Sequence, residues 1–140
     1  MSGSRRIHWG LVFLAGFLAE VGMMVLFFVF LAAAALAGVP ELARPESTFD
    51  FINAMVSGYL MMFLFALWAS RRIESGFALH GALIGLTGAL LFTVLVFFLS
   101  GSLAQPPLYL VAHGLKVIGG ITGGIVANKR SVTSRTLVKT

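Results

Sequence analysis

The chain of 140 residues contains no cysteine, and only 11% of its residues are charged. Without cysteine it can form no disulfide, no thiolate metal site and no palmitoylation site. It also lacks a phosphate-binding glycine loop, an HExxH zinc motif and any Cys–His or Ser–His–Asp set with a domain to hold it. We therefore expect neither an enzyme nor a metal site.

Apolar residues are abundant instead. Hydrophobic residues make up 59% of the chain, which also has thirteen Phe and sixteen Gly, whereas a soluble domain is about half apolar and a quarter charged. The composition predicts an integral membrane protein with a single transmembrane domain over residues 1–140. The net charge is +5. The basic residues that cause it flank apolar segments and form no continuous stripe, so we expect anionic lipid headgroups, not nucleic acid, as partners.

Four stretches are long enough to cross a hydrocarbon core, which takes about 20 apolar residues. They cover residues 9–37, 49–69, 77–99 and 108–127, and a basic tail follows at 128–140. Turn residues separate them: Ser47 with Asp50 resembles a capping box, Gly76 closes a turn, and proline suits the start of the last span. The sequence therefore predicts an all-α, four-helix transmembrane bundle. The first span exceeds the roughly 7–15 apolar residues of a signal peptide and contains Glu20, so we expect a retained helix.

Basic residues lie almost entirely on one side of this predicted bundle. The opposite side has only Arg44, next to the acidic residues Glu41, Glu46 and Asp50. The positive-inside rule then places both termini in the cytoplasm, N-in and C-in, and we expect a bacterial inner membrane. The basic residues on the terminal side are Arg5, Arg6, Arg71, Arg72, Lys129, Arg130, Arg135 and Lys139.

Two ionisable residues, Glu20 and Lys116, fall deep inside predicted spans. Glu20 lies roughly 16 Å and Lys116 roughly 19 Å from the cytoplasmic face, at 1.5 Å per helical residue. Each charge costs on the order of 2.5–3.5 kcal/mol to insert. Because their signs are opposite and their depths match, the first interpretation is a structural ion pair between helices one and four, which must then be adjacent. The second is a proton- or ligand-coupled role for Glu20, and the third is a partner in another subunit.

Glycines recur at helical spacing in the last two spans. Small residues four apart let helices approach closely, so these rows predict helix packing. Packing within the chain and a seam between two copies are both open interpretations. The glycines are Gly81, Gly85 and Gly88 in the third span and Gly119, Gly120, Gly123 and Gly124 in the fourth.

Four further polar residues are candidates for a ligand site or a polar network: His80, His113, Asn53 and Ser57. The two histidines differ in depth by roughly 17 Å on the helical rise, so they cannot both ligate one haem iron within a monomer. A single histidine could hold a haem or pigment, although a histidine bonded inside the bundle is the simpler interpretation. Asn53 and Ser57 are one turn apart and are expected to link helices.

Two resemblances rest on longer motifs. The segments ALWASRRIESGFALHGALIGLTGALL and LYLVAHGLKVIGGITGGIVANKR resemble small four-helix bacterial membrane proteins of no established activity, which implies the fold alone. The stretch GFLAEVGMM is similar to the first helix of small multidrug resistance transporters. That resemblance implies that Glu20 is the proton- and drug-binding residue of an antiparallel dimer.

The leading functional hypothesis is a non-catalytic accessory or assembly subunit, which packs through glycine-rich helix faces against a larger membrane complex or a second copy. The alternative is a small proton-coupled transporter that acts as an oligomer through Glu20. A third hypothesis is a haem- or pigment-binding subunit that uses His113 or His80. No other cofactor is expected.

Overall fold

The computed structural model describes residues 7–39, 47–104 and 106–137, with side chains described as far as Ser131. These residues form four helices: α1 (Trp9–Leu36), α2 (Thr48–Ser70), α3 (Phe77–Ser100) and α4 (Pro107–Leu137). All four are long and apolar enough to cross a membrane. The predicted all-α fold with four long apolar helices is confirmed for the described part of the chain.

The helix ends follow the turn residues that the sequence contains. The Ser47 hydroxyl accepts a hydrogen bond from the Asp50 amide at 3.1 Å and so caps α2, as its side-chain oxygen is suited to do. Gly76, which precedes α3, has a φ of 70°, a left-handed conformation that glycine adopts without steric cost. Pro107 is the first residue of α4, where its missing amide hydrogen costs no helical hydrogen bond.

The fourth helix is longer than its apolar part. We predicted a span over residues 108–127, but α4 continues to Leu137. No glycine or proline occurs between Asn128 and Leu137, so nothing in the basic stretch interrupts the backbone hydrogen bonds. The apolar pattern predicted where a membrane-spanning part would end, and it did not predict where the helix ends.

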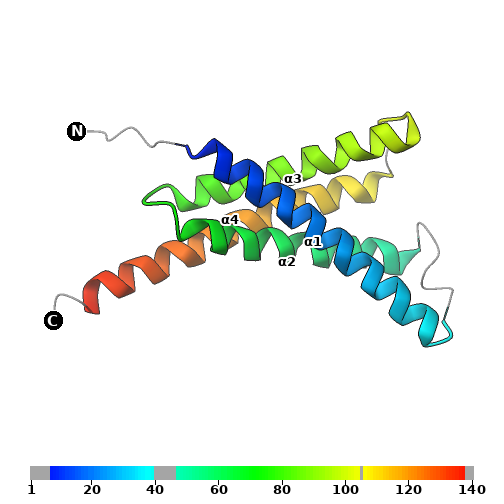
Figure 1. The fold of residues 1–140 in the computed structure, drawn as a ribbon, viewed down its shortest axis with the longest axis horizontal. Helices are drawn as coiled ribbons and strands as arrows, with labels where there is room; N and C mark the ends of the chain where they lie inside the picture. Colours follow the sequence, from blue (N-terminus) through cyan, green and yellow to red (C-terminus); the bar gives the residue numbers. More distant parts are fainter. Residues whose placement is uncertain (1–6, 40–46, 105, 138–140) are drawn as a thin grey trace.

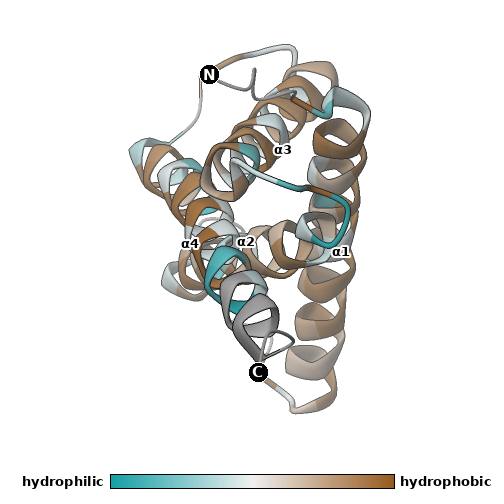
Figure 2. Ribbon diagram, turned by 90° about the vertical axis from the view of Figure 1, so that its left-hand side faces the viewer, coloured by the Kyte–Doolittle hydropathy of each residue, from teal (hydrophilic) through white to brown (hydrophobic). Residues whose placement is uncertain are grey.

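The helices alternate in direction. Figure 1 shows α1 and α3 starting at the end of the bundle at which α2 and α4 finish. α4 packs against both α2 and α3, and α1 lies across the other side of that same pair. Figure 2 shows apolar residues along all four helices, with hydrophilic residues gathered toward the end of α4.

The core is built from small side chains on α1 and α2. Alanines allow these helices to approach closely, and larger residues such as Met62 and Ile84 fill the remaining space. The buried cluster consists of Val12, Ala15, Ala19, Met62, Ala66, Ala69, Ile73 and Ile84.

Candidate functional site: a buried ion pair

Glu20 lies on the one face of α1 that is turned into the protein. The buried residues of that face recur three and four positions apart, as one side of a helix requires. A Cβ on Gly16 would lie 3.0 Å from Thr87 of α3, so α1 sits close to α3 one turn before Glu20. The buried residues are Val12, Ala15, Gly16, Ala19, Glu20 and Met23, with Ala34 further along.

Lys116 of α4 reaches this carboxylate directly. Its Nζ atom donates a hydrogen bond to Oε1 of Glu20 at 2.6 Å, slightly shorter than the usual distance of about 2.7–2.9 Å between an ammonium group and a carboxylate. The side chains are only 2% and 9% exposed for Lys116 and Glu20, respectively. The structure therefore brings the two predicted charges together within one chain.

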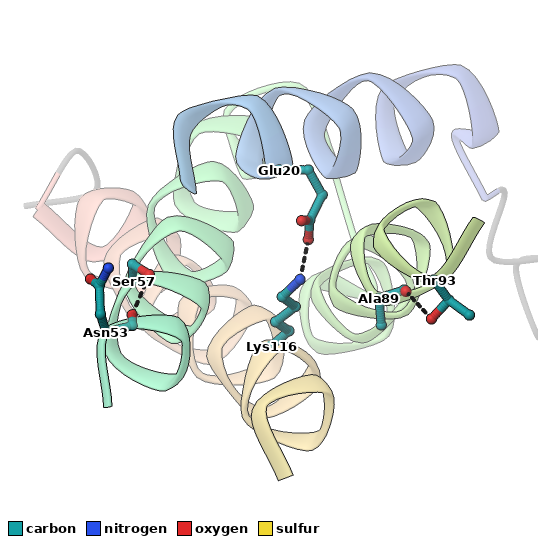
Figure 3. A network of polar contacts seen from close by, with 6 residues as sticks. All are labelled: Glu20, Asn53, Ser57, Ala89, Thr93 and Lys116. Carbon is teal, nitrogen blue, oxygen red and sulfur yellow. Dashed lines mark hydrogen bonds and ion pairs between the residues drawn. The ribbon is translucent and has the colours of Figure 1, made fainter. Parts of the chain in front are cut away.

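The helices that carry the pair are not neighbours, and our expectation that helices one and four are adjacent is wrong. No Cα atom of α1 lies within 8 Å of a Cα atom of α4 in the described residues. Figure 3 shows Glu20 and Lys116 extending toward each other between α2 and α3. The physical reason is the length of the lysine side chain, which bridges helices on opposite sides of the α2–α3 pair.

Two glycines make room for this crossing. A Cβ on Gly58 of α2 would lie 3.2 Å from Cγ and Cε of Lys116. A Cβ on Gly88 of α3 would lie 2.8 Å from Oε1 of Glu20 and would also overlap the end of Met62. Since real Cβ atoms essentially never come closer than 3.0 Å, a side chain at position 88 would force the ends of Met62 and Glu20 to shift. Gly58 leaves the lysine stem just enough space.

An aromatic ring completes the surroundings of the ammonium group. Nζ of Lys116 lies 4.5 Å from the centre of the Phe92 ring, within the range of a cation–π contact. Phe92 also packs edge-on against His113 at 5.5 Å and stacks on Tyr109. The second carboxylate oxygen of Glu20, Oε2, is buried and has no hydrogen-bond partner among the described residues.

The glycines of α4 form two rows that face different helices. A Cβ on Gly119 or Gly123 would strike a backbone carbonyl oxygen of α2, whereas one on Gly120 or Gly124 would strike a carbonyl oxygen of α3. Gly120 meets Gly81 in a reciprocal contact. The rows therefore place the backbone of α4 against both neighbours within a single chain.

The third-helix glycines divide in the same way. Gly81 and Gly85 face the backbone of α4, the latter against Lys116 and Val117. Gly88 instead faces Met62 and Glu20. The predicted stripe thus serves two contacts, one with α4 and one with the buried pair.

His80 uses both of its ring nitrogens in local contacts. Its Nδ1 lies 2.9 Å from the Gly76 carbonyl oxygen, and its Nε2 lies 3.3 Å from the backbone amide nitrogen of His8. Because the amide can only donate, Nε2 accepts and Nδ1 carries the proton. Through these two contacts His80 ties the start of α1 to the first turn of α3.

Asn53 and Ser57 are both buried, but the Ser57 hydroxyl does not link two helices. It donates a hydrogen bond to the backbone carbonyl of Asn53 in its own helix, as serine commonly does one turn along. Besides the Lys116–Glu20 pair, two links between helices come from tyrosines: Tyr59 contacts Thr122 at 3.1 Å, and Tyr109 donates to Asp50 at 3.2 Å.

Sequence reasoning missed several residues of this site. Gly58 is the one glycine of α2, and a single glycine inside an apolar helix could have indicated a position where another residue packs closely against the backbone. Phe92 is one of thirteen phenylalanines, so nothing in the sequence marked it as the ring beside Lys116. In the residues that the structure describes, no group of three or more His, Cys, Asp or Glu side chains could hold a metal ion.

Comparisons with family models, with curated proteins and with solved structures found no match to this chain. The two resemblances drawn from the sequence stay predictions, as do the hypotheses about function and cofactors.

Proposed function

We propose that the protein is a multi-pass membrane protein with both termini in the cytoplasm of a bacterial cell. The support is the length and apolar character of all four helices, together with Arg71, Arg72, Lys129 and Arg130 near the ends of α2 and α4. α1 starts at that same end (Figure 1). The basic residues at 5, 6, 44 and 139 and the acidic residues at 41 and 46 lie outside the described residues, as does the side chain at 135.

The absence of native cysteine makes this topology directly testable. Ser75 and Ser102 are exposed residues at opposite ends of the bundle, in the turns before and after α3. A membrane-impermeant maleimide added to intact cells should label a Ser102→Cys variant, and it should label Ser75→Cys only after permeabilisation. The reverse pattern would contradict the proposed orientation.

We further propose that the protein is a non-catalytic accessory subunit that packs against another membrane protein through α1. The observation that carries this proposal is the uncovered apolar surface of α1. Because α1 touches only α2 and α3, it exposes more large apolar side chains than any other helix among the described residues. The glycine rows of α4, which we had expected to meet a partner, are occupied within the chain.

Site-specific photo-cross-linking distinguishes a partner subunit from lipid. A photoreactive phenylalanine at Phe17 of α1 should give a discrete protein adduct in native membranes. The same group at Val94 of α3 should react only with lipid, although both native side chains are 50% exposed. Adducts from both positions, or from neither, would contradict a dedicated face on α1. An adduct between two copies would replace the accessory subunit with a homo-oligomer.

A second candidate function is proton-coupled transport through Glu20. The observation that favours it is the unpartnered Oε2 atom on a buried carboxylate, because ionisable residues inside a membrane commonly mark proton or ion pathways. A transporter should lose resistance or uptake when Glu20 is replaced by Gln, while the protein level in the membrane is unchanged. Unchanged transport in Glu20→Gln would eliminate this candidate.

A further inference from the structure

A pocket of about 490 Å³ lies where the end of α2, the turn after it and α4 meet. The segments that line it are the end of α2, the turn after it, the start of α3 and the later part of α4, which lie toward the left-hand side of Figure 1. Pockets for small ligands span roughly 300–1,000 Å³. The lining residues are Leu64, Leu67, Trp68, Ser70, Arg71, Ile73, Phe77, Ala127, Arg130 and Ser131.

The polarity of this lining changes along the helix axes. Along α2 the lining begins with Leu64 and ends with Ser70, and Arg71 follows directly after the helix, about 10 Å from Leu64 on the helical rise. On α4 it begins with Ala127 and ends with Arg130 and Ser131. Because α2 and α4 run in the same direction, their apolar lining residues form the inner wall and their polar lining residues form the outer rim, which Ile73 of the turn and Phe77 at the start of α3 complete.

The rim has the chemistry of a phosphate site. Arg71 and Arg130 carry guanidinium groups, which bind phosphate oxygens in a bidentate manner, and none of the lining residues is acidic. In the sequence, Trp68 lies between the apolar lining residues of α2 and the polar residues of the rim. Tryptophan favours this boundary in membranes, where an apolar ring meets headgroups.

We propose that this pocket binds one phospholipid with a net negative headgroup. The phosphate lies between Arg71 and Arg130, and an acyl chain follows Leu64 and Leu67 along the inner wall. A free phosphate ion would use the rim alone and leave the apolar wall uncovered, so the lining as a whole fits a lipid better. This inference rests on the proposed insertion of the helices into a membrane and is independent of any partner subunit.

Tryptophan quenching tests the site directly. The chain has two tryptophans, so a Trp9→Phe background leaves Trp68 as the sole fluorophore. The protein is reconstituted in phosphatidylcholine vesicles that contain phosphatidylglycerol or phosphatidylcholine with brominated acyl chains. Brominated phosphatidylglycerol should quench Trp68 at lower mole fraction, and Arg130→Gln should reduce that preference by about tenfold or more, the loss expected for a charge-assisted hydrogen bond to the phosphate. Arg71→Gln should act in the same direction.

Lys129→Gln is the matched control. Lys129 is adjacent to Arg130 on α4 and does not line the pocket, so this variant loses the same charge and should keep the lipid preference. Equal losses in Lys129→Gln and Arg130→Gln would show diffuse surface attraction and overturn the site. So would quenching that is equal for both lipids, or a preference abolished by added inorganic phosphate. Flotation with the vesicles is measured in every sample: a chain that does not float contradicts membrane insertion, whereas a floating chain without lipid preference contradicts the lipid site alone.

Discussion

Replacing Glu20 and Lys116 by methionine, singly and together, measures how strongly the buried pair couples its two helices. Each single change leaves the other charge in an interior where Lys116 is 2% and Glu20 is 9% exposed. Removing one partner of a buried ion pair destabilises a protein by about 3–5 kcal/mol. Replacing both partners by apolar residues of similar size is neutral, or stabilises by about 1–4 kcal/mol. We therefore expect the double variant to be more stable than either single variant.

The magnitude of the non-additivity is the test. If the two sites were independent, the double variant would lose the sum of the single effects, or about 6–10 kcal/mol. Unfolding free energies can be measured by titrating the purified protein with SDS in mixed micelles, provided that refolding reproduces the same curve. A double variant that loses the full sum would refute the coupling. Single variants within about 1 kcal/mol of the wild type would refute the desolvation on which the estimate rests.

Three further changes can be followed in the same titration. Gly81→Ala should destabilise the protein by about 1–3 kcal/mol or more, because the added Cβ would overlap the carbonyl oxygen of Gly120. In Gly114→Ala the added Cβ meets no atom within 4 Å, so this variant should be more stable by up to about 1 kcal/mol through helix propensity. Equal effects of the two substitutions would contradict the close α3–α4 contact. Ser47→Ala should cost about 1 kcal/mol through the lost cap of α2, and no change would show that the cap is replaced by solvent. Gly58→Ala crowds the lysine stem and should cost less in a Lys116→Met background, so an unchanged cost would mean that the stem is not the obstacle.

The positions of the helices were largely readable from the sequence, and their lateral arrangement was not. Hydropathy gives where a chain enters and leaves an apolar layer, and matching depths correctly suggested that Glu20 and Lys116 could meet. Depth says nothing about which helices are neighbours. The information on neighbours was in α4, where Gly119 and Gly120 begin rows on adjacent faces. Because the backbone of α4 packs closely against both α2 and α3, α1 must lie on the opposite side of the α2–α3 pair.

The details of the site depended on tertiary structure. Phe92 could not be singled out, because a phenylalanine facing lipid and one facing an ammonium group look the same in sequence. Ser57 was expected to bond across helices, but a hydroxyl one turn from a carbonyl has a partner in its own helix at no cost in chain entropy. Long-range polar contacts such as that between Tyr109 and Asp50 require the fold before they can be identified.

The crossing of Lys116 between α2 and α3 also has a consequence for the order of biosynthesis. Glu20 and Lys116 are 96 residues apart in the chain, which takes roughly 5–20 s to synthesise at about 5–20 residues per second. In the proposed membrane setting, α1 therefore enters with a carboxylate whose counter-ion has not yet been made. α4 arrives last, and it must dock against α2 and α3 before its lysine can reach Glu20. The ion pair is thus the closing step of assembly, and a chain released before α4 is complete carries an unneutralised acid.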